Sequence, residues 1–494
     1  MKKLLIGAAV AVPVIWAGAT WGISNKTESV FDDIITKSNE DLSNKFPFVV
    51  IEKQAYTKGF TSSTAQSVMK VNSEYFGDSD KGKDFSVTFN HTVFHGPVMK
   101  TPYGLTTGSS YVYTTIDQTA LPVEVSSILK VLFDDKEPLI SGMKTGLGGG
   151  VSVDFEVSPI SLNQSKISSL KASELDIDPE QLEHFSFTGI TGHLKTDKVS
   201  SYAKGDVKFG ALELKGKDGG EMLTLKLKES IMKLDVSEFY NGTALDGTVD
   251  MEIPEFSVAK GDNEGVTITG VTIHTDTTNQ GGSNLSGKFT LGVDKLLLNI
   301  PDAPFKLPVS AINLAGEVNS LDTAAVKKAI DLGSELQKTQ FAMFKNDFSE
   351  ESFEEMANKS MAYVNAIGEM VKQGTELKYQ IDINNETGES QLKLDLNYAE
   401  AKKLFDLKTV KELVTALSGQ LNISIGKGMI SGTPLEEAIG MPVAMGFAVD
   451  KEKSYELVAD LSSGELKVNG EPMPVLDMVG DQPLPWEELK DSFK

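Results

Sequence analysis

Two histidines four residues apart, His91 and His95, are the pair whose type and spacing first suggest chemistry. On a helix this spacing would place both imidazoles on one face, where they could hold a metal ion. The surrounding DFSVTFNHTVFH alternates apolar and polar residues, so we expect a strand, on which the two histidines lie about 13 Å apart. Zinc also needs a third ligand. We therefore predict no metal site, and we expect His95 to form a hydrogen bond in the turn at Gly96-Pro97.

Nucleophilic catalysis finds little support in the residues. Lys144-Thr145-Gly146 and Ser168-x-x-Lys171 resemble two motifs of penicillin-binding enzymes, but their order is reversed and no Ser-Asp-Asn occurs. The chain has no cysteine, which excludes a thiol nucleophile, a thiolate metal site and a disulfide framework. We expect a protein that is not an enzyme and needs no cofactor. An envelope hydrolase remains a third hypothesis, which would require a serine, a histidine and an acid to converge.

Charge narrows the range of partners. All 47 basic residues are lysine, and against 70 acidic residues the formal net charge is −23. Nucleic acid is excluded as an expected partner, because binding phosphates needs a cationic surface. An anionic lipid surface is disfavoured for the same reason. The charge instead indicates an acidic body that stays soluble.

The N-terminal residues indicate where that body is delivered. Lys2 and Lys3 precede an uninterrupted apolar run over residues 4–24, which is long enough to span a bilayer. Trp16 and Trp21 occupy positions in this run that suit interfacial anchors. The alternative is a cleaved signal peptide, because Ala17-Gly18-Ala19 matches a cleavage site. We expect residues 1–24 to be a single transmembrane helix or signal in the bacterial inner membrane, with the bulk of the chain in the periplasm. The helical spacing of Val30, Ile34, Ser38 and Leu42 predicts a juxtamembrane helix over 25–46.

Residues 47–318 predict a β-rich periplasmic region. Alternating runs such as Val151, Val153, Phe155 and Val157 are typical of antiparallel strands with one buried and one wet face. A shorter helix is expected near 120–135. In the 264–276 stretch the apolar residues change parity at Gly270, which predicts a β-bulge.

Residues 319–418 predict a helical region with an embedded hairpin. One helix follows Ser320, another begins at Ser349, and a third is expected over about 400–417. Residues 419–494 predict a C-terminal β region and tail, with a strand over 441–449 and a hairpin across 462–464. The expected fold class is therefore α+β and β-rich. It comprises one or more large twisted antiparallel sheets, a helical segment on one face or end, and one N-terminal transmembrane helix.

Three short motifs carry a resemblance to a known family. They are YTKGFTSSTA, the His95-Gly96-Pro97 turn and the C-terminal LKVNGEPMP. With the N-terminal run, the chain resembles the YdgA-like family of bacterial envelope proteins, a family of unknown function, although Lys58 stands where the family has arginine. The resemblance implies an inner-membrane anchor, a body facing the periplasm and self-association as a possible homodimer, and it carries no catalytic residues across. The candidate family-motif or interaction residues are Tyr56, Gly59, Phe60, Ser62, Ser63, His95, Gly96, Pro97, Asn469 and Gly470.

The same motifs also have a plainly structural interpretation. Gly59 can supply a permissive backbone in a turn, and Ser62 and Ser63 can cap it or pair across strands. The leading functional hypothesis is a non-enzymatic role in envelope structure or assembly, through self-association or protein partners. The alternative is a lipid-binding protein, in which one long apolar sheet face cradles acyl chains. The sequence leaves open whether helices or lipid cover that face.

Overall fold

The computed structural model describes residues 27–59, 61–72, 85–95, 98–171, 181–197, 201–261, 264–299, 310–345, 349–474, 476–477 and 480–487. The chain divides into two compact units, one of Met1–Phe239 with Ser334–Met356 and the other of Tyr240–Gly333 with Ala357–Lys494. The expected N-terminal helix over 1–24 lies outside the described residues. Within the described ranges, no helix combines the length and the apolar character that crossing a membrane requires.

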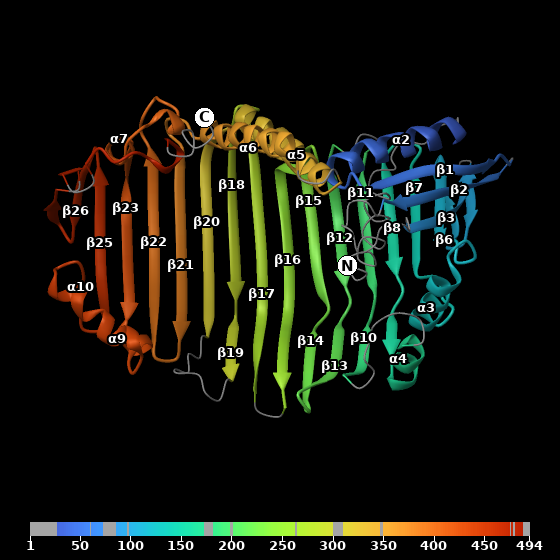
Figure 1. Ribbon diagram of the computed structural model, residues 1–494, viewed down its shortest axis with the longest axis horizontal. Coiled ribbons are helices and arrows are strands. Elements are labelled where there is room, and N and C mark those ends of the chain that lie inside the picture. The colour runs from blue at the N-terminus through green and yellow to red at the C-terminus, as the bar shows by residue number, and fades with distance from the viewer. Residues whose placement is uncertain are drawn as a thin grey trace. The chain divides into compact units, whose positions relative to one another are not determined.

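The first unit is built on an antiparallel sheet (Figure 1). Its strands follow in spatial order and each pairs antiparallel with the next. They are β1 (Val49–Thr57), β2 (Ser62–Val71), β3 (Phe85–His95), β6 (Ser110–Ile116), β7 (Leu139–Thr145), β8 (Val151–Val157), β11 (Ile190–Thr196), β12 (Ala203–Phe209) and β15 (Ser230–Tyr240).

Several of these strands continue past a kink. The continuations pair in the order β9 (Ile160–Leu162), β10 (Leu182–Phe187), β13 (Leu212–Asp218) and β14 (Glu221–Leu227). Gly189 lies at the kink between β10 and β11 with a φ of +97°, and a Cβ there would run into the Val157 carbonyl oxygen. Only glycine tolerates this combination without strain. A separate hairpin of β4 (Val98–Thr101) and β5 (Gly104–Thr107) follows β3.

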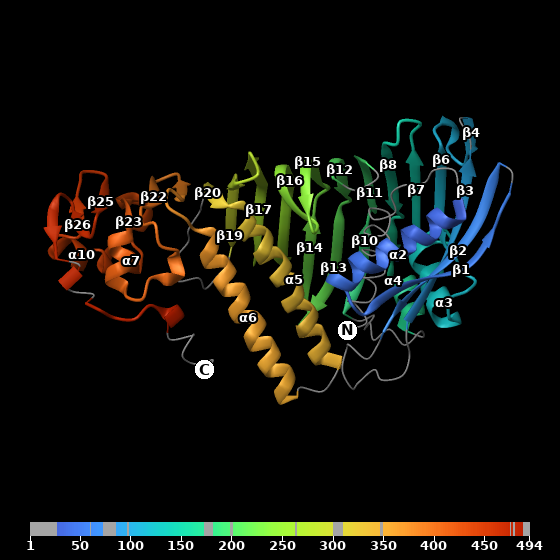
Figure 2. The same cartoon turned by 90° about the horizontal axis from the view of Figure 1, so that it is seen from above.

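Helix α2 (Thr27–Lys45) covers one face of this sheet (Figure 2). Phe31, Ile34, Ile35 and Leu42 are buried in the core beneath it, and each contributes about 1.5–3 kcal/mol by leaving water. Lys53 on β1 links the helix to the sheet through ion pairs to Glu28 and Asp32 at 2.9 and 2.8 Å. The shorter α3 (Val123–Phe133), in the expected 120–135 range, packs with α4 (Gln164–Lys171) in a satellite cluster around Ile167 and Leu170.

The second unit is a longer antiparallel sheet. Its strands again pair in succession. They are β16 (Thr243–Lys260), β17 (Glu264–Gln280), β18 (Asn284–Val293), β20 (Ala311–Asp322), β21 (Glu376–Asn385), β22 (Gly388–Tyr398), β23 (Leu417–Gly426), β25 (Ser454–Ser462), β26 (Glu465–Val468) and β27 (Glu471–Met473). The short β19 (Lys295–Asn299) also pairs with β17, and β24 (Val449–Asp450) with β25.

Two long helices, α5 (Thr323–Lys345) and α6 (Glu350–Met370), are divided between the units. In the second unit, Val326 and Ile330 of α5 pack on Leu245 and Leu285 at one end of the sheet. In the first, Phe341 of α5 makes an edge contact with Phe48, with ring centroids 5.4 Å apart. The β-rich fold with a large antiparallel sheet and a few helices is thus confirmed.

Three local predictions are wrong. The helix expected over 400–417 reduces to a 3₁₀ turn, η3 (Leu404–Asp406), and α7 (Val410–Ala416), because Thr409 caps the helix start. Of the strand expected over 441–449, only Val449 lies in a strand, and residues 441–444 lie in the helix α10 (Gly440–Ala444). It follows α8 (Lys427–Ile430) and α9 (Pro434–Ala438).

The predicted bulge at Gly270 is the third error. The register runs unshifted from Ile253↔Val271 to Glu255↔Thr269. Gly270 instead adopts a φ of +62°, and Pro254 stands opposite it in that register. Both strands change parity there together, so their apolar residues stay opposite one another across the pair.

Candidate functional site

Two of the predicted motif residues meet directly. Ser63 on β2 and His95 at the end of β3 form a hydrogen bond of 2.9 Å between Oγ and Nε2. The Ser63 hydroxyl also accepts from the Gly59 backbone N–H at 3.3 Å. Burial and the nearby Lys58 ammonium lower the pKa of His95. Ser63 is only 1% exposed, so this pair holds the β1–β2 turn against β3 and gives a substrate no access to the hydroxyl.

The remaining residues of the first motif surround that turn. A Cβ on Gly59 would collide with the Ser62 carbonyl oxygen, which explains the glycine. Ser62 stands opposite Phe94 in the β2–β3 pairing. The Tyr56 hydroxyl is buried and has no hydrogen-bond partner within the described part of the chain. Phe60, Gly96 and Pro97 lie outside the described residues, and so does the turn in which we expected His95 to form a hydrogen bond.

His91, which we did not expect to bind a metal, lies in a polar cluster within the core. Its Nε2 is 2.8 Å from the Ser67 hydroxyl and its Nδ1 is 2.9 Å from the Thr114 hydroxyl. Phe31 of α2 contacts the imidazole edge-on, with centroids 5.3 Å apart. Burial lowers the pKa of His91 to about 3, so the ring is neutral. Thr114 stands opposite His91 in the β3–β6 register, and Ser67 lies diagonally across from it on β2. Sequence reasoning singled out neither residue, because alternation within one strand does not reveal the register.

Asn469 and Gly470 form the turn between β26 and β27, with φ values of +51° and +87°. The Asn469 side chain accepts from the Val458 backbone N–H at 3.0 Å and donates to the carbonyl oxygens of Gly446 and Phe447, each at 3.2 Å. These contacts fasten the loop after α10 to β25. Their role in the described structure is to hold this corner of the sheet together.

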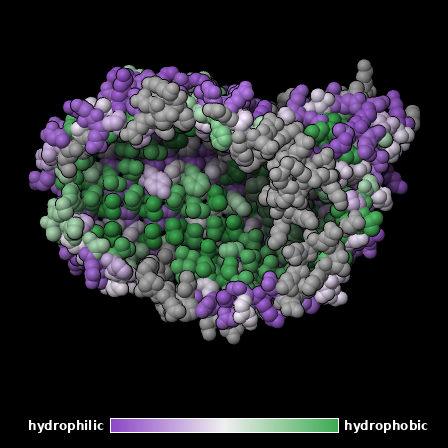
Figure 3. Space-filling model, in the orientation of Figure 1, coloured by the Kyte–Doolittle hydropathy of each residue, from purple (hydrophilic) through white to green (hydrophobic). Residues whose placement is uncertain are grey.

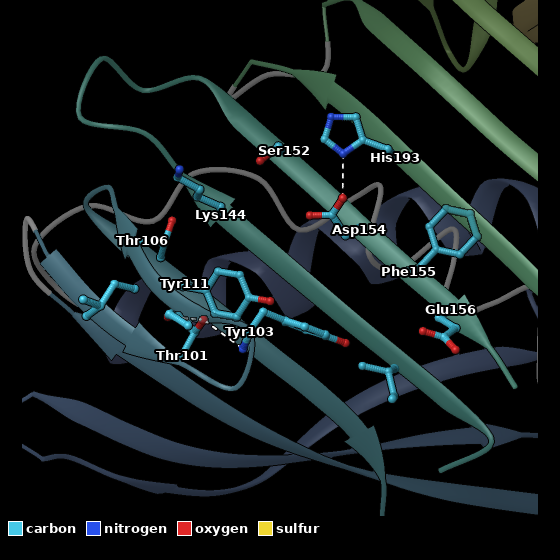
Figure 4. A pocket seen from close by; sticks show the side chains of 13 residues that line it. Thr101, Tyr103, Thr106, Tyr111, Lys144, Ser152, Asp154, Phe155, Glu156 and His193 are labelled. Atoms are coloured by element: carbon cyan, nitrogen blue, oxygen red, sulfur yellow. Dashed lines mark hydrogen bonds and ion pairs between the residues drawn. The ribbon is translucent and has the colours of Figure 1, made fainter. Parts of the chain in front are cut away.

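A polar pocket lies on the wet face of the first unit, beneath the β4–β5 hairpin (Figure 4). Its volume is about 540 Å³, within the range of small-molecule sites. The walls come from β4–β5, β6, β7, β8 and β11. The lining residues are Thr101, Tyr103, Gly104, Leu105, Thr106, Tyr111, Ile140, Lys144, Ser152, Asp154, Phe155, Glu156 and His193.

The pocket brings a serine, an acid and a histidine near one another. His193 Nδ1 lies 2.6 Å from Asp154 Oδ1, and Ser152 is two residues before Asp154 on β8. The β8–β11 register pairs Asp154 with His193 but Ser152 with Lys195, which sets the serine one step along the strand from the imidazole. Ser168 lies in α4 and donates to the Gln164 carbonyl oxygen at 2.8 Å. Within the described residues, no three His, Asp or Glu side chains gather as a metal site would require.

A second candidate site is an apolar face on the second unit. Strand pairing aligns one aliphatic residue from each of eight consecutive strands in a single row. The row is Met251, Ile273, Leu291, Leu314, Ile381, Leu392, Ile423 and Leu457. A neighbouring row contains Phe289, Tyr379, Leu394 and Leu421. We call the surface formed by these two rows the apolar face.

The opposite side of the same strands is polar. Lys288 and Glu317 face each other at 3.5 Å, and Gln420 donates to Asp460 at 2.7 Å. His274 pairs with Asp250 at 2.6 Å. Because side chains alternate across a sheet, this division shows that only one face is suited to water.

Protein covers the apolar face only in part. Every residue of the eight-strand row is partly exposed, and Phe289 is 37% exposed. At about 4.8 Å between strands, the row is roughly 33 Å long. Figure 3 shows hydrophobic residues gathered in a hollowed surface over these strands. Monomeric soluble proteins rarely leave so long an apolar surface without a partner or ligand.

Comparison with known proteins assigns the chain to a family. A profile of the family described as "Bacterial protein of unknown function (DUF945)" matches residues 1–475, and the chain belongs to this family. It is 28% identical to Protein YdgA of Escherichia coli (strain K12) over 171 residues, which cover 33% of each chain. The match thus spans about a third of that relative's length. The YdgA-like resemblance is confirmed, and no solved structure matches the chain.

Proposed function

We propose that the apolar face of the second unit binds the acyl chains of a lipid. The observation that supports this most is the eight-strand aliphatic row, which remains partly exposed although the reverse side of the same strands is mostly polar. An antiparallel sheet with one apolar face needs something to cover that face. In the second unit, α5 packs at one end of it, around Leu245 and Leu285.

Acyl chains suit the row better than a folded protein surface does. The row carries no hydrogen-bonding side chain, and an acyl chain needs none. Burying one methylene contributes about 0.8 kcal/mol. Ten methylenes would therefore contribute roughly 8 kcal/mol, equivalent to micromolar affinity, before the cost of ordering the chain.

The proposed location agrees with a lipid ligand. The apolar run over 4–24 would tether the body to the outer side of the bacterial inner membrane, where lipid is at hand. Protease added to spheroplasts should then digest the body as it digests periplasmic markers. Survival of the body while those markers disappear would contradict this location.

The competing function is envelope assembly, in which a second copy or another protein covers the same face. Native mass spectrometry of the full-length chain released from detergent separates the two. We expect adducts with the mass of a phospholipid or fatty acid on the wild type. Leu291→Glu, which places a carboxylate in the row, should lose them.

The matched control is Thr290→Glu, one residue away on the polar side of β18, which should keep the adducts. Circular dichroism checks that both variants fold. A wild type free of lipid and recovered as a dimer would contradict the lipid proposal and support self-association. Equal loss in both variants would also contradict it, because the effect would then not depend on the face.

A further inference from the structure

The polar pocket of the first unit has features that the proposed lipid function does not use. It opens on the wet face of the sheet, and its walls combine tyrosine rings with both acidic and basic side chains. Figure 4 shows these side chains converging from the β4–β5 hairpin and from the strands beneath it. A concave site that mixes aromatic and convergent polar groups is the usual form of a small-molecule site.

Of the two tyrosines that line the pocket, Tyr103 is exposed and Tyr111 is largely buried, and neighbouring residues hold both in place. Tyr103, in the turn of the hairpin, is 65% exposed. Its ring contacts Tyr113 edge-on at 6.2 Å between centroids, and its backbone N–H donates to the Thr101 hydroxyl at 3.3 Å. Tyr111 lies over Gly142, where a Cβ would strike its hydroxyl. The glycine therefore leaves room for a ring on the pocket floor.

The tyrosine hydroxyls are hydrogen-bond donors at any physiological pH. Partial burial, followed by the neighbouring Tyr113, Glu156 and Asp154, raises the pKa of Tyr103. Burial is also the main cause of the raised pKa of Tyr111. Figure 4 shows both hydroxyls directed toward the side of the pocket that carries Asp154 and Glu156. Donors and acceptors thus lie side by side around one aromatic surface.

The charges of the pocket have mixed sign. Asp154 and Glu156 are acidic, Lys144 is basic, and His193 is paired with Asp154 at 2.6 Å. An anion would meet the two carboxylates, and a cation would meet Lys144. A neutral ligand rich in hydroxyl groups meets no such repulsion, and it uses donors and acceptors equally.

We propose that this pocket binds a neutral oligosaccharide, with one sugar ring against Tyr103 and its hydroxyls shared among Asp154, Glu156 and Lys144. The C–H face of a sugar ring is apolar and weakly positive, which matches the negative face of an aromatic ring. The hydroxyl rim of the sugar then meets the carboxylates and the ammonium. The pocket volume of about 540 Å³ accommodates a short oligosaccharide.

Saturation-transfer NMR on the full-length chain in detergent tests this, with maltotriose and chitotriose as probes. We expect saturable transfer from the protein to at least one of the two sugars, and the pair distinguishes hexose from N-acetylhexosamine recognition. Tyr103→Ala should raise the dissociation constant on the order of tenfold, equivalent to about 1.4 kcal/mol. Asp154→Asn should weaken binding as well, because it removes a charged acceptor without changing the side-chain shape.

Val98→Ala is the matched control, since Val98 is 63% exposed on the same hairpin but does not line the pocket. It should bind as the wild type does. Absence of saturable transfer to both sugars would overturn the proposal, and so would binding that Tyr103→Ala leaves unchanged. Choline chloride is the counter-probe. If it binds through Tyr103 while the sugars do not, the pocket is a cation site and the proposal fails.

Discussion

At the residue scale, His91 shows how a buried histidine can have a purely structural role in an acidic protein. Two hydroxyls, from Ser67 and Thr114, satisfy both ring nitrogens at 2.8 and 2.9 Å. A neutral imidazole has one donor and one acceptor, and hydroxyls can serve either. The cluster therefore needs no charge, and Phe31 of α2 closes it from the helix side.

This arrangement predicts a pH-dependent stability. The pKa of His91 is about 3 in the folded protein and about 6.5 in the unfolded chain. Below pH 6.5 the unfolded chain therefore binds a proton that the folded protein does not, so stability is lost as the pH falls. Between pH 7 and 5 this amounts to about 2 kcal/mol.

His91→Gln removes the titrating ring and keeps a group that can donate and accept. We expect the free energy of unfolding, measured in urea, to fall less between pH 7 and pH 5 in this variant than in the wild type. The two decreases should differ by about 2 kcal/mol. Comparing the two slopes cancels the other titrating groups. Parallel slopes would show that the folded protein can protonate His91.

The Ser63–His95 hydrogen bond shows that sequence motifs can identify residues that meet in the fold. YTKGFTSSTA and His95 were singled out separately, and the structure joins them at 2.9 Å. The pocket was not foreseen, because its members Tyr103, Asp154 and His193 are spread over ninety residues. Their meeting depends on the β8–β11 register, which single-strand alternation does not reveal.

At the element scale, alternation predicted strands well where one face is wet. The hairpin of β21 and β22 and the hairpin across 462–464 are both present. In the latter, Ser463 and Gly464 have φ values of +50° and +86°, as a tight turn of this kind requires.

The failures at this scale have local causes. The 441–449 run is apolar without alternation, so its period was ambiguous. Pro442 fits the first turn of α10, where its missing N–H costs nothing. In the 400–417 stretch, Thr409 accepts from Glu412 N at 3.2 Å, and Glu412 reaches back to the Lys408 N–H at 2.6 Å. This Thr-x-x-Glu capping box marked the true helix start and was readable in the sequence.

At the scale of the whole molecule, membership of a bacterial family of unknown function supplies no chemistry. The proposed function rests instead on the difference between the apolar face and the polar side of the second unit. Each strand alternates, which was readable from sequence. The alignment of aliphatic residues across eight strands depends on register and on chain order. The sequence therefore indicated an apolar face but could not tell how much of it the helices cover.

The most direct test of the account is photo-cross-linking in living cells. Two variants of the full-length chain would each carry the photo-reactive residue p-benzoylphenylalanine at one position. One replaces Leu392, on the apolar face, and the other replaces Lys393, on the polar side of the same strand. After irradiation, mass spectrometry of the labelled peptide should show a lipid adduct at position 392 and none at 393. Cross-links from position 392 to protein alone, with no lipid adduct, would contradict the claim that acyl chains occupy the apolar face.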